Sequence, residues 1–184
     1  LVERRQVMKR MIFLAAAMAL LLAGAVWAQP YIGAKTGMMM IDDEGTDSID
    51  NLIPIGLLFG YEVAPRMAVE GEFNYKIAGG GFDLDCDDEG GLDLWAFGAY
   101  FAYRYPLGDN LYLKGKGGVL YESVSWDWPC GYGDLLGDDS DTDTGLSIGV
   151  GVGMKLNEKI TGEAEFTMLE SDLNYISVGL NMAL

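Results

Sequence analysis

The stretch Gly-Leu-Ser-Ile-Gly-Val-Gly-Val-Gly-Met-Lys-Leu, residues 145–156, decides the fold. Apolar side chains occupy every second position from Leu146 to Leu156, and glycine, serine or lysine fills the positions between. A period of two is that of a β-strand, whose successive side chains point to opposite faces. A tilted strand of about 9–11 residues crosses a bilayer. The stretch therefore predicts a membrane-spanning strand with one apolar face and one small or polar face.

The same alternation recurs in seven further segments, which are 31–40, 54–61, 67–77, 94–105, 111–121, 160–168 and 174–184. Tight turns are expected at 63–66, 106–110 and 157–159, and longer loops at 41–52, 78–93 and 122–144, with a shorter fourth at 169–173. Short turns at one end and longer loops at the other are typical of an outer-membrane barrel. We therefore predict an all-β fold, an eight-stranded antiparallel up-and-down transmembrane β-barrel.

Alternation alone does not say which face lies inside, because a soluble carrier barrel alternates with its apolar face inward. Here one face is almost free of charge, whereas the other carries glycine and charges of both signs. A narrow lumen needs small residues for space and a partner for each buried charge. We therefore expect lipid on the apolar face. The expected lumen ion-pair network consists of Lys35, Glu70, Glu72, Arg104, Lys114, Lys116, Lys155, Glu163 and Glu165.

The first 28 residues have the pattern of a secretory signal peptide. Lys9 and Arg10 precede an unbroken apolar run, 11–22, and small residues lead to Ala28. This order of basic, apolar and small residues predicts cleavage after Ala28. It leaves residues 29–184 as the barrel domain. The alternative, a transmembrane anchor, would have an apolar stretch at the short limit for spanning a bilayer.

Several short motifs resemble the OmpA-like family of outer-membrane barrels. They are Tyr-Ile-Gly-Ala-Lys-Thr-Gly at 31–37, Gly-Leu-Leu-Phe-Gly-Tyr at 56–61 and Ala-Tyr-Arg-Tyr-Pro-Leu at 102–107. The end of the chain, Ser-Val-Gly-Leu-Asn-Met-Ala-Leu at 177–184, is similar to the signal read by the outer-membrane assembly machinery, with Leu184 where the family usually has Phe. The resemblance implies a small opacity-type barrel in the bacterial outer membrane. It also implies that Lys35 pairs with a lumen glutamate such as Glu72.

Composition excludes several classes of function. The chain has 28 Asp and Glu against 12 Lys and Arg, a net charge of −16, which disfavours binding to phosphate backbones. It contains no His, so no mechanism that needs an imidazole is available. We therefore expect no catalytic residues, no enzymatic activity and no nucleic-acid partner.

The expected loops hold 20 of the acidic residues and no Lys or Arg. Solubility and surface repulsion account for such a charge. Clustered carboxylates are also the ligands that Ca²⁺ prefers, and two segments have an Asp-x-Asp-x-Asp rhythm without the glycine and glutamate of an EF-hand loop. The candidate calcium ligands are Asp83, Asp85, Asp87, Asp139, Asp141 and Asp143. No other cofactor is expected.

Cys86 and Cys130 fall in the second and third expected loops. Exported proteins meet an oxidising compartment, so we expect a disulfide between these two residues.

These features predict an integral outer-membrane barrel with a structural or surface-interaction role, a packed polar lumen and acidic external loops. Its expected partners are membrane lipids, lipopolysaccharide and the assembly machinery, with a host or surface ligand open. The first alternative is a narrow porin-like channel for ions or small solutes. The second is a soluble periplasmic carrier.

Overall fold

The computed structural model of the protein describes residues 29–41, 51–83, 89–127, 140–169 and 173–184. These ranges form nine strands: β1 (Pro30–Ile41), β2 (Ile53–Ala64), β3 (Met67–Ala78), β4 (Gly81–Asp83), β5 (Glu89–Pro106), β6 (Leu111–Asp127), β7 (Ser140–Lys155), β8 (Ile160–Met168) and β9 (Leu173–Ala183). Within them, no helix has the length and apolar character needed to cross a membrane.

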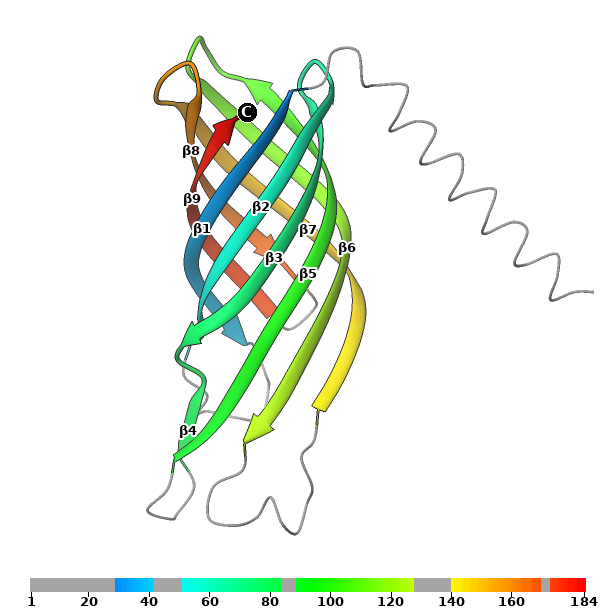
Figure 1. The fold of residues 1–184 in the computed structure, drawn as a ribbon, viewed down its shortest axis with the longest axis vertical. Coiled ribbons are helices and arrows are strands. Elements are labelled where there is room, and N and C mark those ends of the chain that lie inside the picture. The colour runs from blue at the N-terminus through cyan, green and yellow to red at the C-terminus, as the bar shows by residue number, and fades with distance from the viewer. Residues whose placement is uncertain (1–28, 42–50, 84–88, 128–139, 170–172) are drawn as a thin grey trace, which may run out of the picture.

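Eight of the strands close into an antiparallel barrel (Figure 1). Each long strand pairs with its neighbour in sequence, and β1 pairs with β9 from Tyr31↔Ala183 to Ile41↔Leu173. The short β4 is an addition that pairs only with the start of β5, while β3 continues the wall by pairing with β5 directly. The predicted eight-stranded up-and-down barrel is confirmed, and β4 is the one described strand that the sequence pattern did not indicate.

The two ends of the barrel differ. At one end, the turn end, consecutive strands are joined by the short connections 65–66, 107–110 and 156–159. At the other, the loop end, β5, β6 and β7 continue beyond β1, β2, β3, β8 and β9, and β4 lies beside the start of β5 (Figure 1).

Parts of the expected loops 78–93 and 122–144 are therefore strand. Asp141 and Asp143, placed in a loop by sequence, pair with Val124 and Glu122 in the β6–β7 ladder. Cross-strand pairing holds this extension although the apolar alternation has stopped.

The outer wall of the barrel is apolar. Its exposed side chains include Ile55, Leu57, Phe59, Phe73, Phe97, Phe101, Val119, Ile148, Val150, Val152, Ile176, Val178 and Leu180. The alternate positions point inward and are buried, among them Glu70, Glu72, Lys114 and Lys116. This arrangement is the one expected for a barrel in lipid, and it is the reverse of a carrier with an apolar interior.

Candidate functional site

The lumen contains a cluster of four cations and four carboxylates, which we call the lumen cluster. Its members are Lys35 on β1, Glu70 and Glu72 on β3, Arg104 on β5, Lys114 and Lys116 on β6, and Glu163 and Glu165 on β8. The glutamates and the β6 lysines come in pairs two residues apart because positions i and i+2 of a strand share a face. Two-residue spacing thus stacks charges along the barrel axis.

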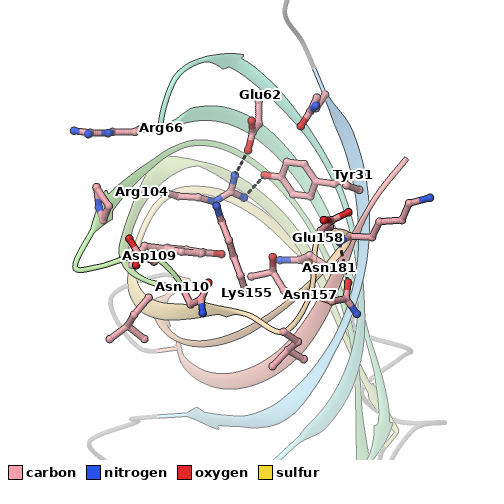
Figure 2. A pocket seen from close by; sticks show the side chains of 18 of the residues that line it. Tyr31, Glu62, Arg66, Arg104, Asp109, Asn110, Lys155, Asn157, Glu158 and Asn181 are labelled. Carbon is pink, nitrogen blue, oxygen red and sulfur yellow. Dashed lines mark hydrogen bonds and ion pairs between the residues drawn. The ribbon is translucent and has the colours of Figure 1, made fainter.

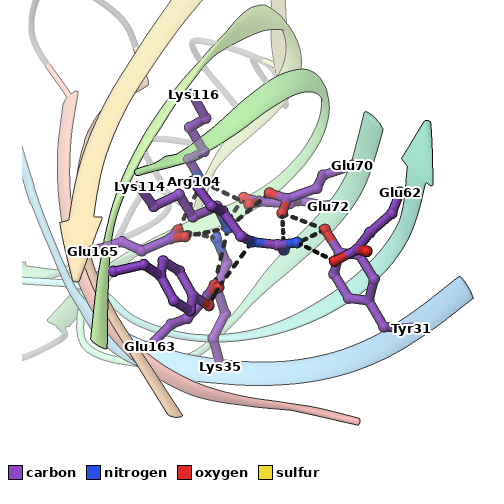
Figure 3. Close-up of polar contacts among 11 residues, drawn as sticks. Tyr31, Lys35, Glu62, Glu70, Glu72, Arg104, Lys114, Lys116, Glu163 and Glu165 are labelled. Carbon is purple, nitrogen blue, oxygen red and sulfur yellow. Dashed lines mark hydrogen bonds and ion pairs between the residues drawn. The ribbon is translucent and has the colours of Figure 1, made fainter. Parts of the chain in front are cut away.

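Lys114 holds the centre of the lumen cluster (Figure 3). Its Nζ lies 2.8 Å from Glu70 Oε2, 2.9 Å from Glu163 Oε2 and 2.5 Å from Glu165 Oε1. The Lys114 side chain is 1% exposed, so its charge is fully removed from water. A charge buried this deeply is tolerated only when it is paired, and three carboxylates from two opposite walls supply the pairing.

Lys116 and Lys35 share the next layer. Lys116 Nζ lies 2.6 Å from Glu72 Oε1 and 2.9 Å from Glu165 Oε2. Lys35 Nζ donates a hydrogen bond to Glu72 and lies 3.9 Å from Glu165. Each ammonium also faces an aromatic ring, Lys116 over Tyr100 at 4.5 Å and Lys35 over Tyr175 at 5.0 Å. These contacts join six barrel strands, β1, β3, β5, β6, β8 and β9.

Arg104 closes the lumen cluster toward the turn end. Its guanidinium donates to Glu62 Oε1 at 3.1 Å, to Glu70 Oε1 at 3.1 Å and to the Tyr31 hydroxyl at 2.6 Å. The guanidinium carbon lies 4.7 Å from the Tyr31 ring centre and 5.7 Å from that of Tyr112. Arg104 is therefore fixed by charge, hydrogen bonds and two aromatic faces at once.

The two tyrosines lie flat against glycines on neighbouring strands. Tyr31 pairs with Gly60, and Tyr112 pairs with Gly153. A Cβ on Gly60 would stand 1.9 Å from the Tyr31 ring, and one on Gly153 would stand 2.2 Å from the Tyr112 ring. Only glycine leaves room for the rings. From this position Tyr31 donates to Glu70 at 2.5 Å, and Tyr112 donates to Glu163.

An apolar layer fills the lumen on the loop-end side of the lumen cluster. It consists of Met39, Leu52, Leu92, Leu94, Ala96, Leu120, Leu169, Leu173 and Tyr175, with Val124 packed against it. We call this set the apolar plug. Sequence reasoning missed it, although the signal was present, since Leu92, Leu94 and Leu120 occupy inward positions of their strands.

A cavity of about 850 Å³ opens at the turn end, and Arg104 separates it from the rest of the lumen cluster (Figure 2). Lys155, which the sequence placed in the ion-pair network, lines this cavity instead. It is exposed and makes no ion pair with a described residue. Lys155 is the last residue of β7 and pairs with Thr161, at the rim of the barrel. The network expected at Lys155 is therefore corrected to the eight residues above.

Three of the remaining predicted site residues, Asp83, Asp141 and Asp143, lie at the loop end. Asp83 falls in β4, and Asp141 and Asp143 fall in β7, where each accepts a hydrogen bond from the backbone N–H of the next residue. Within the described ranges, no group of three or more Cys, Asp or Glu has the arrangement of a metal site. The other predicted residues, Asp85, Asp87, Asp139, Cys86 and Cys130, lie outside the described residues, as does the signal sequence 1–28.

The fold and its paired lumen charges define an outer-membrane β-barrel of the small, closed type. Residues 11–181 match the family described as "Outer membrane protein beta-barrel domain", and the chain belongs to this family. No curated protein matches the sequence. The short turns of such barrels face the periplasm, so the turn end is periplasmic and the loop end external.

Solved structures share the fold at low sequence identity. Neisserial surface protein A has 12% identity and a TM-score of 0.65 over 85% of this chain and 99% of its own. The N-terminal barrel of Pseudomonas aeruginosa OprF has 10% identity and a TM-score of 0.57, covering 85% and 99%. Ail of Yersinia pestis, in complex with the heparin analogue sucrose octasulfate, has 18% identity and a TM-score of 0.52, covering 85% and 96%.

Proposed function

We propose that the protein is a closed structural barrel of the outer membrane that presents an acidic surface to the exterior. One observation carries the proposal. The lumen is filled in two successive layers, the lumen cluster and the apolar plug, and in each layer buried side chains meet across the axis. An eight-stranded barrel is barely wide enough for its own side chains, so two filled layers leave no continuous aqueous path.

Conductance in planar bilayers tests this proposal against the channel alternative. We expect the purified, folded protein to be electrically silent under conditions in which a reference porin conducts. Folding is checked in the same preparation by the shift in gel mobility on heating. Reproducible single-channel steps from the folded protein would favour the narrow channel and contradict the closed barrel.

The acidic loop end supports a role in surface interaction. Phosphate groups of neighbouring lipopolysaccharide and the carboxylates of this end can share divalent cations, because hard cations prefer oxygen ligands of both kinds. The candidate carboxylates are Asp83, Asp85, Asp87, Asp139, Asp141 and Asp143. Calorimetric titration with Ca²⁺, comparing wild type with Asp141→Asn/Asp143→Asn, tests the idea. Unchanged heats in the variant would remove these two residues from any calcium site.

We also propose that the protein has no enzymatic activity, because it lacks His and because the buried lumen carboxylates are bound to cations rather than free for proton transfer. The apolar outer wall supports membrane insertion over the soluble-carrier alternative. Cell fractionation tests the latter, since a soluble carrier would be released without detergent. The mass of the mature protein tests signal cleavage, which we expect to leave Gln29 as the first residue.

A further inference from the structure

The turn-end cavity gathers four cations, of which only Arg104 also belongs to the lumen cluster. Arg66, Arg104, Lys155 and Lys159 line it, which is half of the eight Lys and Arg in residues 29–184. Three carboxylates, those of Glu62, Asp109 and Glu158, line it as well. Glu62 is already bound to Arg104, at 3.1 Å. The lining therefore carries one more cation than carboxylates, in a strongly acidic protein.

Lys155 is the residue that calls for an explanation. It stands on an inward position of β7, at the level of the cavity, and has no ion-pair partner among the described residues. In the view of Figure 2, its side chain reaches into the cavity in the direction of the Arg104 guanidinium. Two cations directed at the same space repel each other. An anion bound between them is attracted to both, which offsets this repulsion.

Arg104 gives this space a rigid wall. Its side chain is 15% exposed and is held by Glu62, Glu70 and the Tyr31 ring, so little ordering is needed when a ligand binds. Uncharged donors complete the lining, among them the amides of Asn110, Asn157 and Asn181. The acidic residues Asp141 and Asp143 lie at the opposite end of β7 from Lys155.

From this geometry we infer that the turn-end cavity is a binding site, open to the periplasm, for a phosphate group. Lysine and arginine are the side chains that bind phosphate in proteins, and the cavity volume of about 850 Å³ admits a phosphate carried on a larger molecule. Such a group has two sources at this position. One is a free phosphorylated solute of the periplasm, and the other is the head group of an inner-leaflet phospholipid at the barrel rim.

Solution NMR of the ¹⁵N-labelled, folded protein in an uncharged detergent tests the inference with inorganic phosphate as the probe. At constant ionic strength we expect saturable shifts of the Arg104 Nε–H signal and of backbone amides at 155–161, with a Kd of about 1–10 mM. Lys155→Met should weaken binding about fivefold. Glu158→Gln, an exposed turn variant, should strengthen it about twofold by removing a repelling charge.

Lys76→Met is the matched control, because it makes the same substitution at the loop end, where Lys76 pairs with Asp93 at 3.1 Å. Its phosphate affinity should equal that of wild type. Equal weakening by Lys76→Met and Lys155→Met would show an effect of net charge alone and overturn the inference, as would the absence of saturable shifts in wild type.

A second measurement separates the two sources of phosphate. The protein is placed in nanodiscs of zwitterionic lipid or of the same lipid with added phosphatidylglycerol. If the same signals shift with anionic lipid and free phosphate then has no further effect, the site is filled by lipid head groups. If only dissolved phosphate shifts them, the ligand is a free solute. Both results support a phosphate site, and neither depends on the conductance of the barrel.

Discussion

Lys114 Nζ on β6 lies 2.5 Å from Glu165 Oε1 on β8 and 2.8 Å from Glu70 Oε2 on β3. Strands β8 and β3 lie on opposite walls of the barrel. One ammonium thus connects opposite walls of the barrel. Because these contacts are independent of the backbone ladder, they resist flattening of the barrel cross-section.

Removing this ammonium should lower the free energy of unfolding. Lys114→Met leaves three carboxylates buried with fewer partners, and breaking a buried pair in this way typically costs about 3–5 kcal/mol. Urea unfolding in lipid vesicles measures the change. Lys159→Met, in an exposed turn, serves as the control and should stay within about 0.5 kcal/mol of wild type. Equal stability of the two variants would mean that the lumen cluster contributes little to the fold.

The packing of Tyr112 on Gly153 predicts a difference in stability between two glycine variants. Gly153→Ala forces a methyl group against the Tyr112 ring, where its Cβ would approach to 2.2 Å, so we expect a loss of about 1–3 kcal/mol. Gly115→Ala is the matched control, since nothing lies within 4 Å of a Cβ at that outward position. The free energies of unfolding of the two variants are compared. The loss caused by Gly153→Ala should be smaller when Tyr112 is also replaced by alanine.

The orientation of the apolar face is open to a direct test at Val150, which is 65% exposed on the outer wall. Val150→Arg should destabilise the protein by about 2–4 kcal/mol if the residue lies near the bilayer midplane, because the charge is then exposed to hydrocarbon. The same change at Thr142, on the loop-end extension of β7, should be close to neutral. A tolerated arginine at 150 would contradict contact with lipid.

The sequence also predicts a disulfide between Cys86 and Cys130. Non-reducing electrophoresis of the unheated and heated protein should show a mobility that changes on reduction. Reduction should lower the free energy of unfolding by about 2–4 kcal/mol. The single variants Cys86→Ser and Cys130→Ser should each behave like the reduced protein. Titration of two free thiols in the unfolded, unreduced wild type would contradict the pairing.

Most of the barrel follows from the period of two, because each lipid-facing strand must be apolar at alternate positions over its full crossing. That constraint is absent beyond the membrane. At 122–127 and 140–144 the residues are mostly Ser, Asp, Glu and Thr, which resemble a loop, yet the two segments pair with each other from Glu122↔Asp143 to Ser125↔Ser140. Pairing between distant segments is not visible in local composition.

Within the site, the pattern indicated which residues face inward but not how far along the axis each one lies. Lys155 and Lys116 are both inward lysines, but only Lys116 reaches Glu72 and Glu165, whereas Lys155 stands at the rim. The tilt and stagger of barrel strands set this height, and they depend on register rather than on residue type. The same limitation hid the apolar plug, since Met39 on β1 and Leu120 on β6 join one cluster only after the barrel has closed.

The pairing of β1 with β9 has a consequence for synthesis. Tyr31 and Ala183 are partners although nearly the whole chain separates them, so the seam between the first and last strands joins the most distant contacts in the molecule. Contacts of such long range form slowly because a large loop must be ordered first. The wall cannot seal before its final segment leaves the ribosome, and until then the chain needs to be kept unfolded on its way to the membrane.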